Sequence, residues 1–268
     1  MSGGCSRRRS APLLGGVSRQ SVEGWETVRV SLYRDVAIVL RTYKLGEADR
    51  IVVLMTRGRG KVRSVAKGVR RTSSKFGSRL EPGSYIQVQL HEGRGELDIV
   101  TQTETVEPFR RTREDLSRLS RASSLLEAVD QLAQDRGASP KLFDMLLGGL
   151  RTVEGQNPPM ISAAFYLKLL ANEGVAPELD VCVECGEEGG PFGLALEAGG
   201  VRCGSCGGGR PVSDDALNVG RAVLGGGLNA VLALPEGAVT HEVETIATRA
   251  LEMHVERRLR SLRLLHDV

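Results

Sequence analysis

The chain has 268 residues, of which 41% are hydrophobic, and this length can bury a sizeable core spread over more than one domain. Its net charge of +3 conceals an asymmetry: residues 1–110 carry 20 basic and 11 acidic side chains, whereas residues 111–268 carry 16 and 22. No apolar run has the length of a membrane span or of a secretory signal, which argues against membrane and secreted classes and predicts a soluble cytoplasmic protein.

Residues 1–30 are rich in Ser, Gly and Arg and show no periodicity, which predicts a disordered leader. A regular sequence pattern starts at Val30. Because bacterial genes sometimes begin at a valine codon, a native start at Val30 is a hypothesis that N-terminal sequencing of the endogenous protein tests. A mature chain beginning near Ser2 would contradict it.

The next segment predicts five short β-strands. Its β-branched residues, partial alternation and glycine turns favour strands over helices. The expected strands are Val36–Tyr43, Arg50–Thr56, Lys61–Ala66, Tyr85–His91 and Glu96–Val106. Five strands of this size suit a small closed barrel of the OB type, with an SH3-like barrel as the structural alternative.

A run of nine basic residues without any Asp or Glu lies inside this strand region. Its members are Arg57, Arg59, Lys61, Arg63, Lys67, Arg70, Arg71, Lys75 and Arg79. Such a run repels itself unless something anionic lies across it, which indicates a polyanion such as a nucleic-acid backbone. A solvated loop that only keeps the protein soluble is the alternative interpretation. Tyr43, Phe76 and Tyr85 are the aromatic candidates for stacking on bases, and each of them also fits a core position.

Helices are expected after Pro108. Leucines and alanines at helical spacing predict a helix over 113–135, Ser139 and Pro140 begin a second that runs to about Val153, and Asn157 and Pro158 begin a third that runs to Glu173. Short connections between them predict a helical bundle. Two more helices are expected, one from Ser213 to the glycines at 225–227 and one from Thr240 to about Leu265.

Four of the five cysteines form two CxxC pairs separated by 17 residues: Cys182, Cys185, Cys203 and Cys206. This spacing is typical of a four-thiolate zinc site, because the two-residue gap lets both sulfurs of a pair face one ion. Residues 191–202 read as the hairpin between the pairs. Thioredoxin-like chemistry is the rival interpretation, but neither pair opens a helix after a strand. Four thiolates complete the tetrahedral shell, so we expect a structural ion and no catalytic one.

No enzyme is indicated. The sequence has no phosphate-binding loop and no dinucleotide fingerprint, and its four histidines are scattered. We therefore predict no catalytic residue and no small-molecule substrate.

Several short segments carry a family resemblance. They include Tyr33–Val36 leading to Val39–Thr42, Gly46–Arg50, Thr56–Lys61, Lys67–Arg71 before Ser74 and Lys75, Leu80–Gly83, the four cysteines and Glu256–Leu262. Together they resemble the RecO family of bacterial recombination mediators and DNA repair proteins. The resemblance runs from about Val30 to Leu265.

The resemblance implies an α+β multidomain protein with an OB-fold barrel, a helical domain and a zinc-bearing module. We predict a leader at 1–30, a DNA-binding OB-fold at 31–110, a helical domain at 111–178, a zinc module at 179–212 and C-terminal helices at 213–268 that pack on the helical domain. The resemblance also implies a nucleoid-associated mediator of the RecFOR pathway. Such a mediator binds single- and double-stranded DNA, anneals complementary strands and helps load RecA onto strands coated by single-stranded DNA-binding protein. The implied partners are RecR and the acidic C-terminal tail of the coating protein, whose pocket lies in the helical region at positions that this sequence does not specify.

Two other functions fit parts of the pattern. One is a zinc-ribbon accessory protein of transcription or translation, and the other is a nuclease with unrecognised carboxylates. If about six of the nine cations contact phosphates, binding to single strands should weaken with salt with a log–log slope of about −4.

Overall fold

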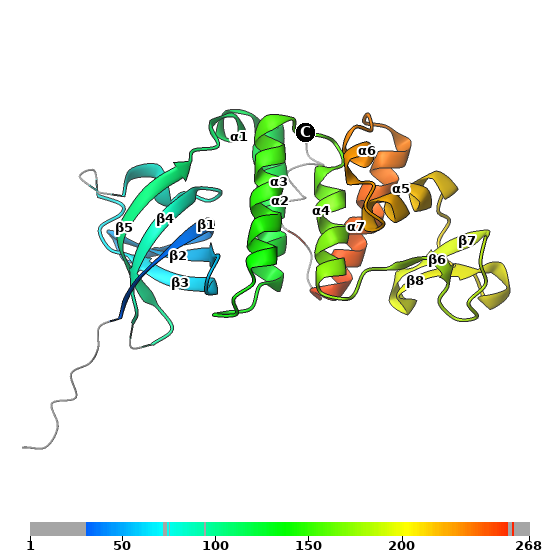
Figure 1. The fold of residues 1–268 in the computed structure, drawn as a ribbon, viewed down its shortest axis with the longest axis horizontal. Helices are drawn as coiled ribbons and strands as arrows, with labels where there is room; N and C mark the ends of the chain where they lie inside the picture. The colour runs from blue at the N-terminus through cyan, green and yellow to red at the C-terminus, as the bar shows by residue number, and fades with distance from the viewer. Residues whose placement is uncertain (1–30, 72–73, 75, 94, 257–258, 260–268) are drawn as a thin grey trace, which may run out of the picture. The chain divides into compact units, whose positions relative to one another are not determined.

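The structure is a computed structural model that describes residues 31–71, 74, 76–93, 95–256 and 259. The predicted leader, Lys75 and most residues after Glu256 lie outside this described part. The segment from Ser31 onward forms one compact unit (Figure 1). Its division into four domains stays a prediction.

Five strands close into a barrel. They are β1 (Leu32–Leu45), β2 (Asp49–Thr56), β3 (Gly60–Ala66), β4 (Tyr85–His91) and β5 (Asp98–Glu107). The strand order β1-β2-β3-β5-β4 closes because β4 also pairs with β1, and the β3–β5 pair is the parallel one. This closed order, with one parallel pair of strands, agrees with the predicted OB-type barrel and not with the SH3-like alternative. All five strands were expected, although β1 begins four residues before the predicted Val36.

Alternation along β1 and β2 serves two different cores. Val39 and Leu54 point into the barrel and belong to its interior cluster, whereas Ile38 and Met55 point outward and join the core of the helices. A β-bulge at Leu40 then places one extra residue in β1, so that Arg41 lies opposite Val53 on the outer face. Helices thus cover one end of the outer face of the barrel, and this cover ends near the bulge.

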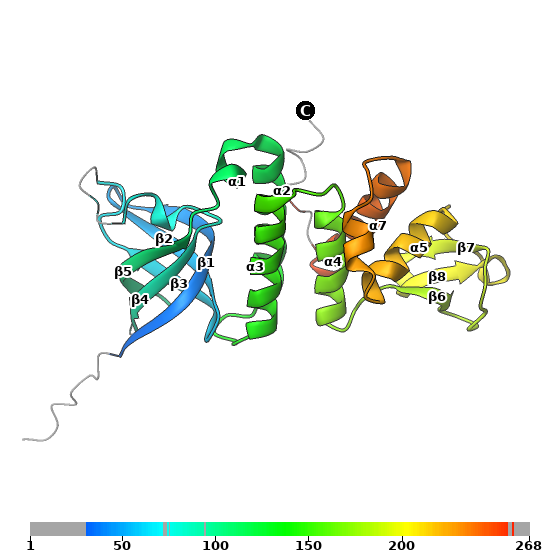
Figure 2. The same cartoon turned by 45° about the horizontal axis from the view of Figure 1, so that its top comes forward.

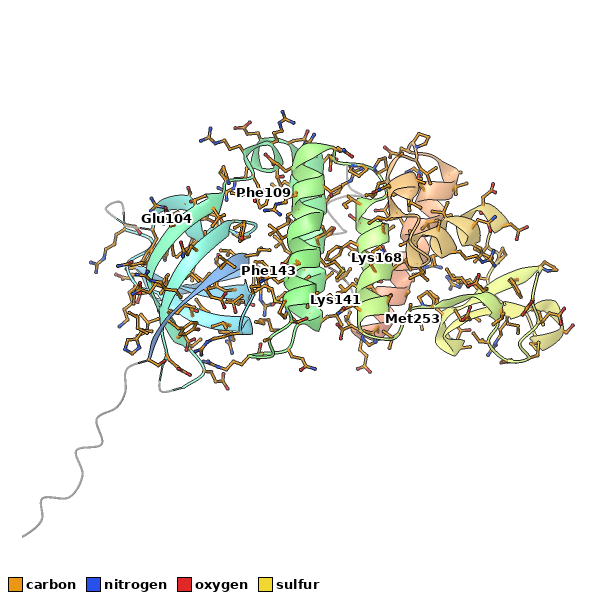
Figure 3. The ribbon with its side chains drawn as sticks, viewed as in Figure 1. Glu104, Phe109, Lys141, Phe143, Lys168 and Met253 are labelled. Atoms are coloured by element: carbon orange, nitrogen blue, oxygen red, sulfur yellow. The ribbon has the colours of Figure 1, made fainter. Side chains whose placement is uncertain are left out.

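In the part of the chain that the structure describes, seven α-helices follow the barrel or the small sheet. They are α1 (Arg110–Glu114), α2 (Leu116–Leu132), α3 (Pro140–Gly155), α4 (Ile161–Asn172), α5 (Asp214–Leu224), α6 (Leu228–Leu232) and α7 (Ala238–His254). Helices α2 and α3 lie side by side next to the barrel in both views (Figures 1 and 2). Phe143 of α3 lies at this junction, where its ring meets the edge of Tyr85 with the centroids 6.0 Å apart (Figure 3). The predicted helical bundle is therefore present, and its core continues onto the barrel.

Several predicted helix bounds are wrong for local reasons. The helix expected over 113–135 is broken at Asp115, which is extended and caps α2 by accepting the Arg118 N–H at 2.9 Å. Helix α4 begins at Ile161 instead of Asn157, because Asn157 has a left-handed φ of 52° and Pro159 disfavours helix at the residue before it. Helix α7 begins at Ala238 with Gly237 as its N-cap, and Thr240 accepts the Gly237 N–H from inside the first turn.

A three-stranded sheet carries the cysteines. It consists of β6 (Glu178–Cys182), β7 (Phe192–Ala195) and β8 (Gly200–Cys203) in the order β6-β8-β7. The hairpin expected over 191–202 is confirmed as β7 and β8, whereas β6 and the short helix α6 were not predicted. Leu179, Leu194 and Val201 of the sheet belong to the helical core, so the sheet is packed onto the helices.

Within the described residues, every helix is too short or too polar to cross a membrane.

Candidate nucleic-acid interface and metal centre

The basic run occupies three successive parts of the barrel. Arg57 and Arg59 lie in the β2–β3 turn, Lys61 and Arg63 point outward from β3, and Lys67, Arg70, Arg71 and Arg79 follow β3. Lys75 lies outside the described residues. The structure therefore places eight of the nine predicted cations, and they do not share one environment.

Four of these cations are paired with carboxylates of the same chain. The ion pairs are Arg57 with Asp144 at 2.9 Å, Arg59 with Glu92 at 3.8 Å, Lys61 with Asp135 at 3.5 Å and Arg63 with Glu96 at 3.3 Å. Part of the negative charge that balances the run thus comes from the chain itself, from the β4–β5 connection, the α2–α3 loop and α3. Sequence reasoning missed Asp135 and Asp144 because each follows its basic partner by more than 70 positions.

Lys61 is enclosed and is a poor candidate for contact with DNA. Its side chain is 14% exposed, and its ammonium group donates to the Asp130 carbonyl at 2.9 Å. Its backbone is bound as well: the Lys61 N–H donates to the Gln134 carbonyl at 3.4 Å, and the Arg136 N–H donates to the Lys61 carbonyl at 2.9 Å. The α2–α3 loop thus runs beside β3 like an additional short strand.

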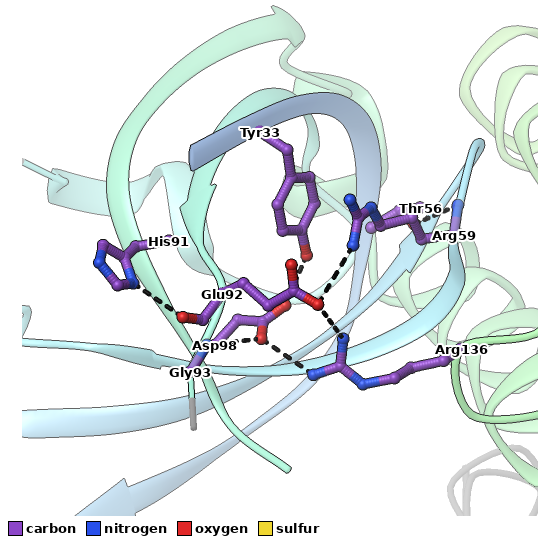
Figure 4. Close-up of polar contacts among 8 residues, drawn as sticks. All are labelled: Tyr33, Thr56, Arg59, His91, Glu92, Gly93, Asp98 and Arg136. Atoms are coloured by element: carbon purple, nitrogen blue, oxygen red, sulfur yellow. Dashed lines mark hydrogen bonds and ion pairs between the residues drawn. The ribbon is translucent and has the colours of Figure 1, made fainter. Parts of the chain in front are cut away.

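A polar network at one end of the barrel holds Arg59 (Figure 4). The Arg59 guanidinium lies 3.8 Å from the centroid of the Tyr33 ring. Tyr33 donates to Asp98 at 2.5 Å, and Arg136 donates to the same carboxylate at 2.9 Å. Burial by itself raises the pKa of Asp98, but the bonds from Tyr33 and Arg136 outweigh it and hold this pKa below its usual value. Burial and the bond to Asp98 raise the pKa of Tyr33. Arg59 is therefore part of a fixed structural network.

Three further cations of the run lie on the turn after β3. Lys67, Arg70 and Arg71 are exposed, and within the described residues no carboxylate forms an ion pair with them. The turn is nevertheless fixed, because the Arg70 N–H donates to Ala48 at 3.0 Å and the Gly68 N–H donates to the Asp49 carboxylate at 2.7 Å. These bonds attach the turn to the β1–β2 connection. The turn therefore presents three positive charges at defined positions, which suits an anionic chain.

The three aromatic candidates for base stacking differ in how accessible their rings are. Phe76 is 2% exposed and belongs to the barrel interior, and Tyr85 packs on Phe143. Tyr43 is 40% exposed on the outer face of β1. The guanidinium of Arg41 lies 4.9 Å from its ring centroid and forms an ion pair with Asp130 at 2.8 Å. Arg41 was not among the predicted residues, since it lies outside the basic run.

The four predicted cysteines come together at one end of the small sheet. Cys182 ends β6 and Cys203 ends β8, while Cys185 and Cys206 follow in tight turns closed by glycines with φ of 75° and 90°. Their sulfurs all lie within 4.8 Å of one another, and the Sγ atoms of Cys185 and Cys203 are 3.7 Å apart. Four sulfurs about 2.3 Å from a central zinc would lie about 3.8 Å apart, so this donor set fits a tetrahedral zinc ion.

The acidity of the thiols also suits a cation. Hydrogen bonds from the backbone of Cys203 and Cys185 lower the pKa of Cys182 to about 6, so that one thiolate forms readily. Side-chain hydrogen bonds with Cys185 and Cys203 raise the pKa of Cys206 to about 12. Four neighbouring sulfurs therefore do not all ionise by themselves, whereas a divalent ion would compensate their charge.

A groove lies between α7 and the small sheet. Its volume is about 530 Å³, and Leu194, Leu196 and Met253 give it an apolar floor. Glu197, Glu252 and Glu256 outnumber Arg210 and Arg249 around it. This excess of acid makes the groove a poor match for an acidic peptide tail, whose position stays unspecified.

Two family models cover almost all of the described chain. The model described as "Recombination protein O N terminal" matches residues 30–109, and the one described as "Recombination protein O C terminal" matches residues 113–263. The chain belongs to the RecO family. The predicted resemblance is thereby confirmed, and so is the α+β class with its OB-like barrel.

Curated relatives agree with this assignment. The DNA repair protein RecO of Frankia casuarinae is 42% identical over 237 residues, which cover 86% of this chain and 97% of the relative. The DNA repair protein RecO of a Nocardioides species is 43% identical over 241 residues, which cover 86% and 98% of the two chains.

Proposed function

We propose that this protein is a non-enzymatic DNA repair mediator of the RecFOR pathway that binds DNA through the cationic end of its barrel. The family assignment and the names of the two relatives support a role in DNA repair over the transcription and translation alternative. The observation that carries the proposal is the fixed turn with the exposed Lys67, Arg70 and Arg71.

Binding in this proposal depends mainly on charge. Exposed cations release the counterions that surround phosphates, so affinity falls as salt rises. Lys67, Arg70, Arg71 and Arg79 are the exposed members of the run after β3. Four contacts predict a log–log salt slope of about −3 for single strands, which is shallower than the slope of about −4 expected from six contacts.

Annealing follows from the same charges. A bound strand has part of its phosphate charge neutralised, which weakens its repulsion of a complementary strand. We propose that the protein binds single- and double-stranded DNA, anneals complementary strands and helps load RecA onto strands covered by single-stranded DNA-binding protein. RecR and the acidic tail of the coating protein are its proposed partners.

Zinc has a structural role in this proposal. Cys182, Cys185, Cys203 and Cys206 would hold the ion, and four thiolate ligands leave no position for a reactive water. The ion would fix β6 to β8, the two strands that carry the first cysteine of each pair.

The test compares two double variants in strand annealing. Arg70→Ala with Arg71→Ala should slow annealing of complementary oligonucleotides at least tenfold and make the salt slope shallower by about 1.4. The matched control is Arg210→Ala with Arg249→Ala, which removes two exposed cations outside the barrel and should anneal like the wild type. Unchanged annealing by the first variant would contradict the proposed interface.

A further inference from the structure

An apolar row crosses four neighbouring strands on the outer face of the barrel. Tyr43 lies opposite Ile51, Ile51 lies opposite Val65, and Val65 lies opposite Ile99. Tyr43 is exposed and the other three side chains are partly exposed. None of the four belongs to the barrel interior or to the core of the helices. With strands about 4.8 Å apart, the row is about 14 Å long.

The row begins where the cover provided by the helices ends. Val53, in the preceding row, is buried in the helical core. The bulge at Leu40 turns Arg41 and Tyr43 to the outer face; without the extra residue they would point inward. Arg41 is bound to Asp130 and lies against the Tyr43 ring, so the ring is held in place while 40% of the residue stays exposed.

Positive charge borders the row on two sides. Arg41 and Arg63 flank it toward the helices, since both lie opposite Val53. On the other side lies the turn with Lys67, Arg70 and Arg71. Acids offset part of this charge, since Asp130 pairs with Arg41 and Asp49 accepts the Gly68 N–H. Glu96 is 86% exposed, and its surface ion pair with Arg63 is easily exchanged.

Single-stranded nucleic acid is the partner that matches both properties. Its phosphates suit the two cationic borders, and its unpaired bases present flat faces that stack on an aromatic ring. Bases in a duplex are already stacked on one another, so a duplex can use only the charges. An acidic peptide would lack the flat faces.

We propose that Tyr43 and the row of Ile51, Val65 and Ile99 form a base-stacking surface that selects single strands over duplexes. This inference rests on the DNA-binding function proposed above and adds a second contact to it. Phosphate contacts give affinity for both forms of DNA, and the ring adds affinity for unpaired bases.

The test uses an oligothymidine and an abasic oligomer of the same length and charge. The wild type should bind the oligothymidine at least tenfold more tightly than the abasic oligomer. Tyr43→Ala should remove this difference and leave duplex binding unchanged, while Tyr43→Phe should behave like the wild type. A reporter is available, because Trp25 is the single tryptophan of the sequence. In Trp25→Phe with Tyr43→Trp, the oligothymidine should quench the fluorescence and the abasic oligomer should not.

The outcomes separate the two proposals. Equal wild-type affinity for both oligomers would overturn base stacking while leaving the phosphate contacts intact. Tyr43→Ala binding oligothymidine as tightly as the wild type would overturn the role of the ring. A wild type that binds neither oligomer in dilute buffer would overturn the DNA-binding function itself.

Discussion

Asp98 accepts hydrogen bonds from three different segments of the chain. Its carboxylate accepts from Tyr33 on β1, from the Gly93 N–H before β5 and from Arg136 in the α2–α3 loop. The carboxylate is fully buried, so its charge is stabilised by these donors and not by water. One side chain thus fastens the helical loop to the barrel.

Replacing Asp98 should therefore change stability and its dependence on pH. The folded-state pKa of Asp98 lies below the unfolded value of about 3.9, so its contribution is complete above that pH and is lost as the pH falls through the folded value. Asp98→Asn should lower the free energy of unfolding at pH 7 by about 3 kcal/mol, which corresponds to about 6–12 °C in melting temperature. Between pH 5 and pH 3 the variant should also lose less stability than the wild type.

Thermal melts at several pH values measure both effects. Glu104→Gln is the matched control, because Glu104 is exposed on the same strand (Figure 3) and its loss should leave the melting curve unchanged. An Asp98→Asn protein that melts like the wild type at every pH would show that the network contributes no stability.

At the scale of elements, the sequence predicted those features that depend on residues close together in the chain. Hydrophobic alternation placed all five barrel strands, and the glycine turns placed the β7–β8 hairpin. The CxxC spacing predicted that the four cysteines gather at one place, because each pair lies within one turn. The predicted helix bounds were wrong where a single residue ends or begins a helix. At Asp115, for example, the carboxylate caps α2 in the middle of a sequence pattern that looks like one continuous helix.

Contacts between distant elements could not be predicted in this way. Arg57 and Lys61 look like open cations in the sequence, but Asp144 and Asp135 reach them only once α3 and its preceding loop pack on the barrel. The exposure of Tyr43 depends likewise on the extra residue at Leu40, because alternation without a bulge would bury it. The residue types of the candidate site were therefore predictable, and their accessibility was not.

Metal removal should act on the small sheet more than on the barrel. A thiol-reactive agent combined with a chelator, or Cys203→Ser, should release zinc and loosen β6 and β8, because metal binding supplies folding free energy to such modules. Hydrogen exchange should rise at residues 178–210, while the barrel strands keep their protection. The released metal can be counted with a colorimetric indicator. Finding no zinc in protein purified without chelators would contradict the metal assignment, and increased exchange in the barrel would contradict its local role.

At the scale of the whole molecule, the barrel and helices share one core. Ile38, Leu40, Val53 and Met55 of the barrel pack in the same apolar cluster as α2, α3 and α4. Leu179 connects the small sheet to this cluster, and the Leu179 carbonyl accepts two hydrogen bonds from Arg221 of α5. Packed side chains thus join the barrel, the helices and the small sheet.

A fragment that ends at residue 110 should consequently not stay monomeric. It would expose the outward apolar residues of β1 and β2 and the backbone of β3 at Lys61, both of which favour association between copies. A fragment of residues 31–156 keeps α2, α3 and the loop, and it should be markedly more soluble. Size-exclusion chromatography of the two fragments at equal concentration measures this, and a monomeric 31–110 fragment would contradict it.

The pairing of the α2–α3 loop with β3 also has a consequence for synthesis on the ribosome. Lys61 leaves the ribosome about 75 residues before Arg136, its backbone partner. At about 5–20 residues per second, the strand waits between about 4 and 15 s for that partner. During this interval nascent chains on neighbouring ribosomes can join through their unfinished edges, so a chaperone that binds this stretch early should improve the yield of native protein.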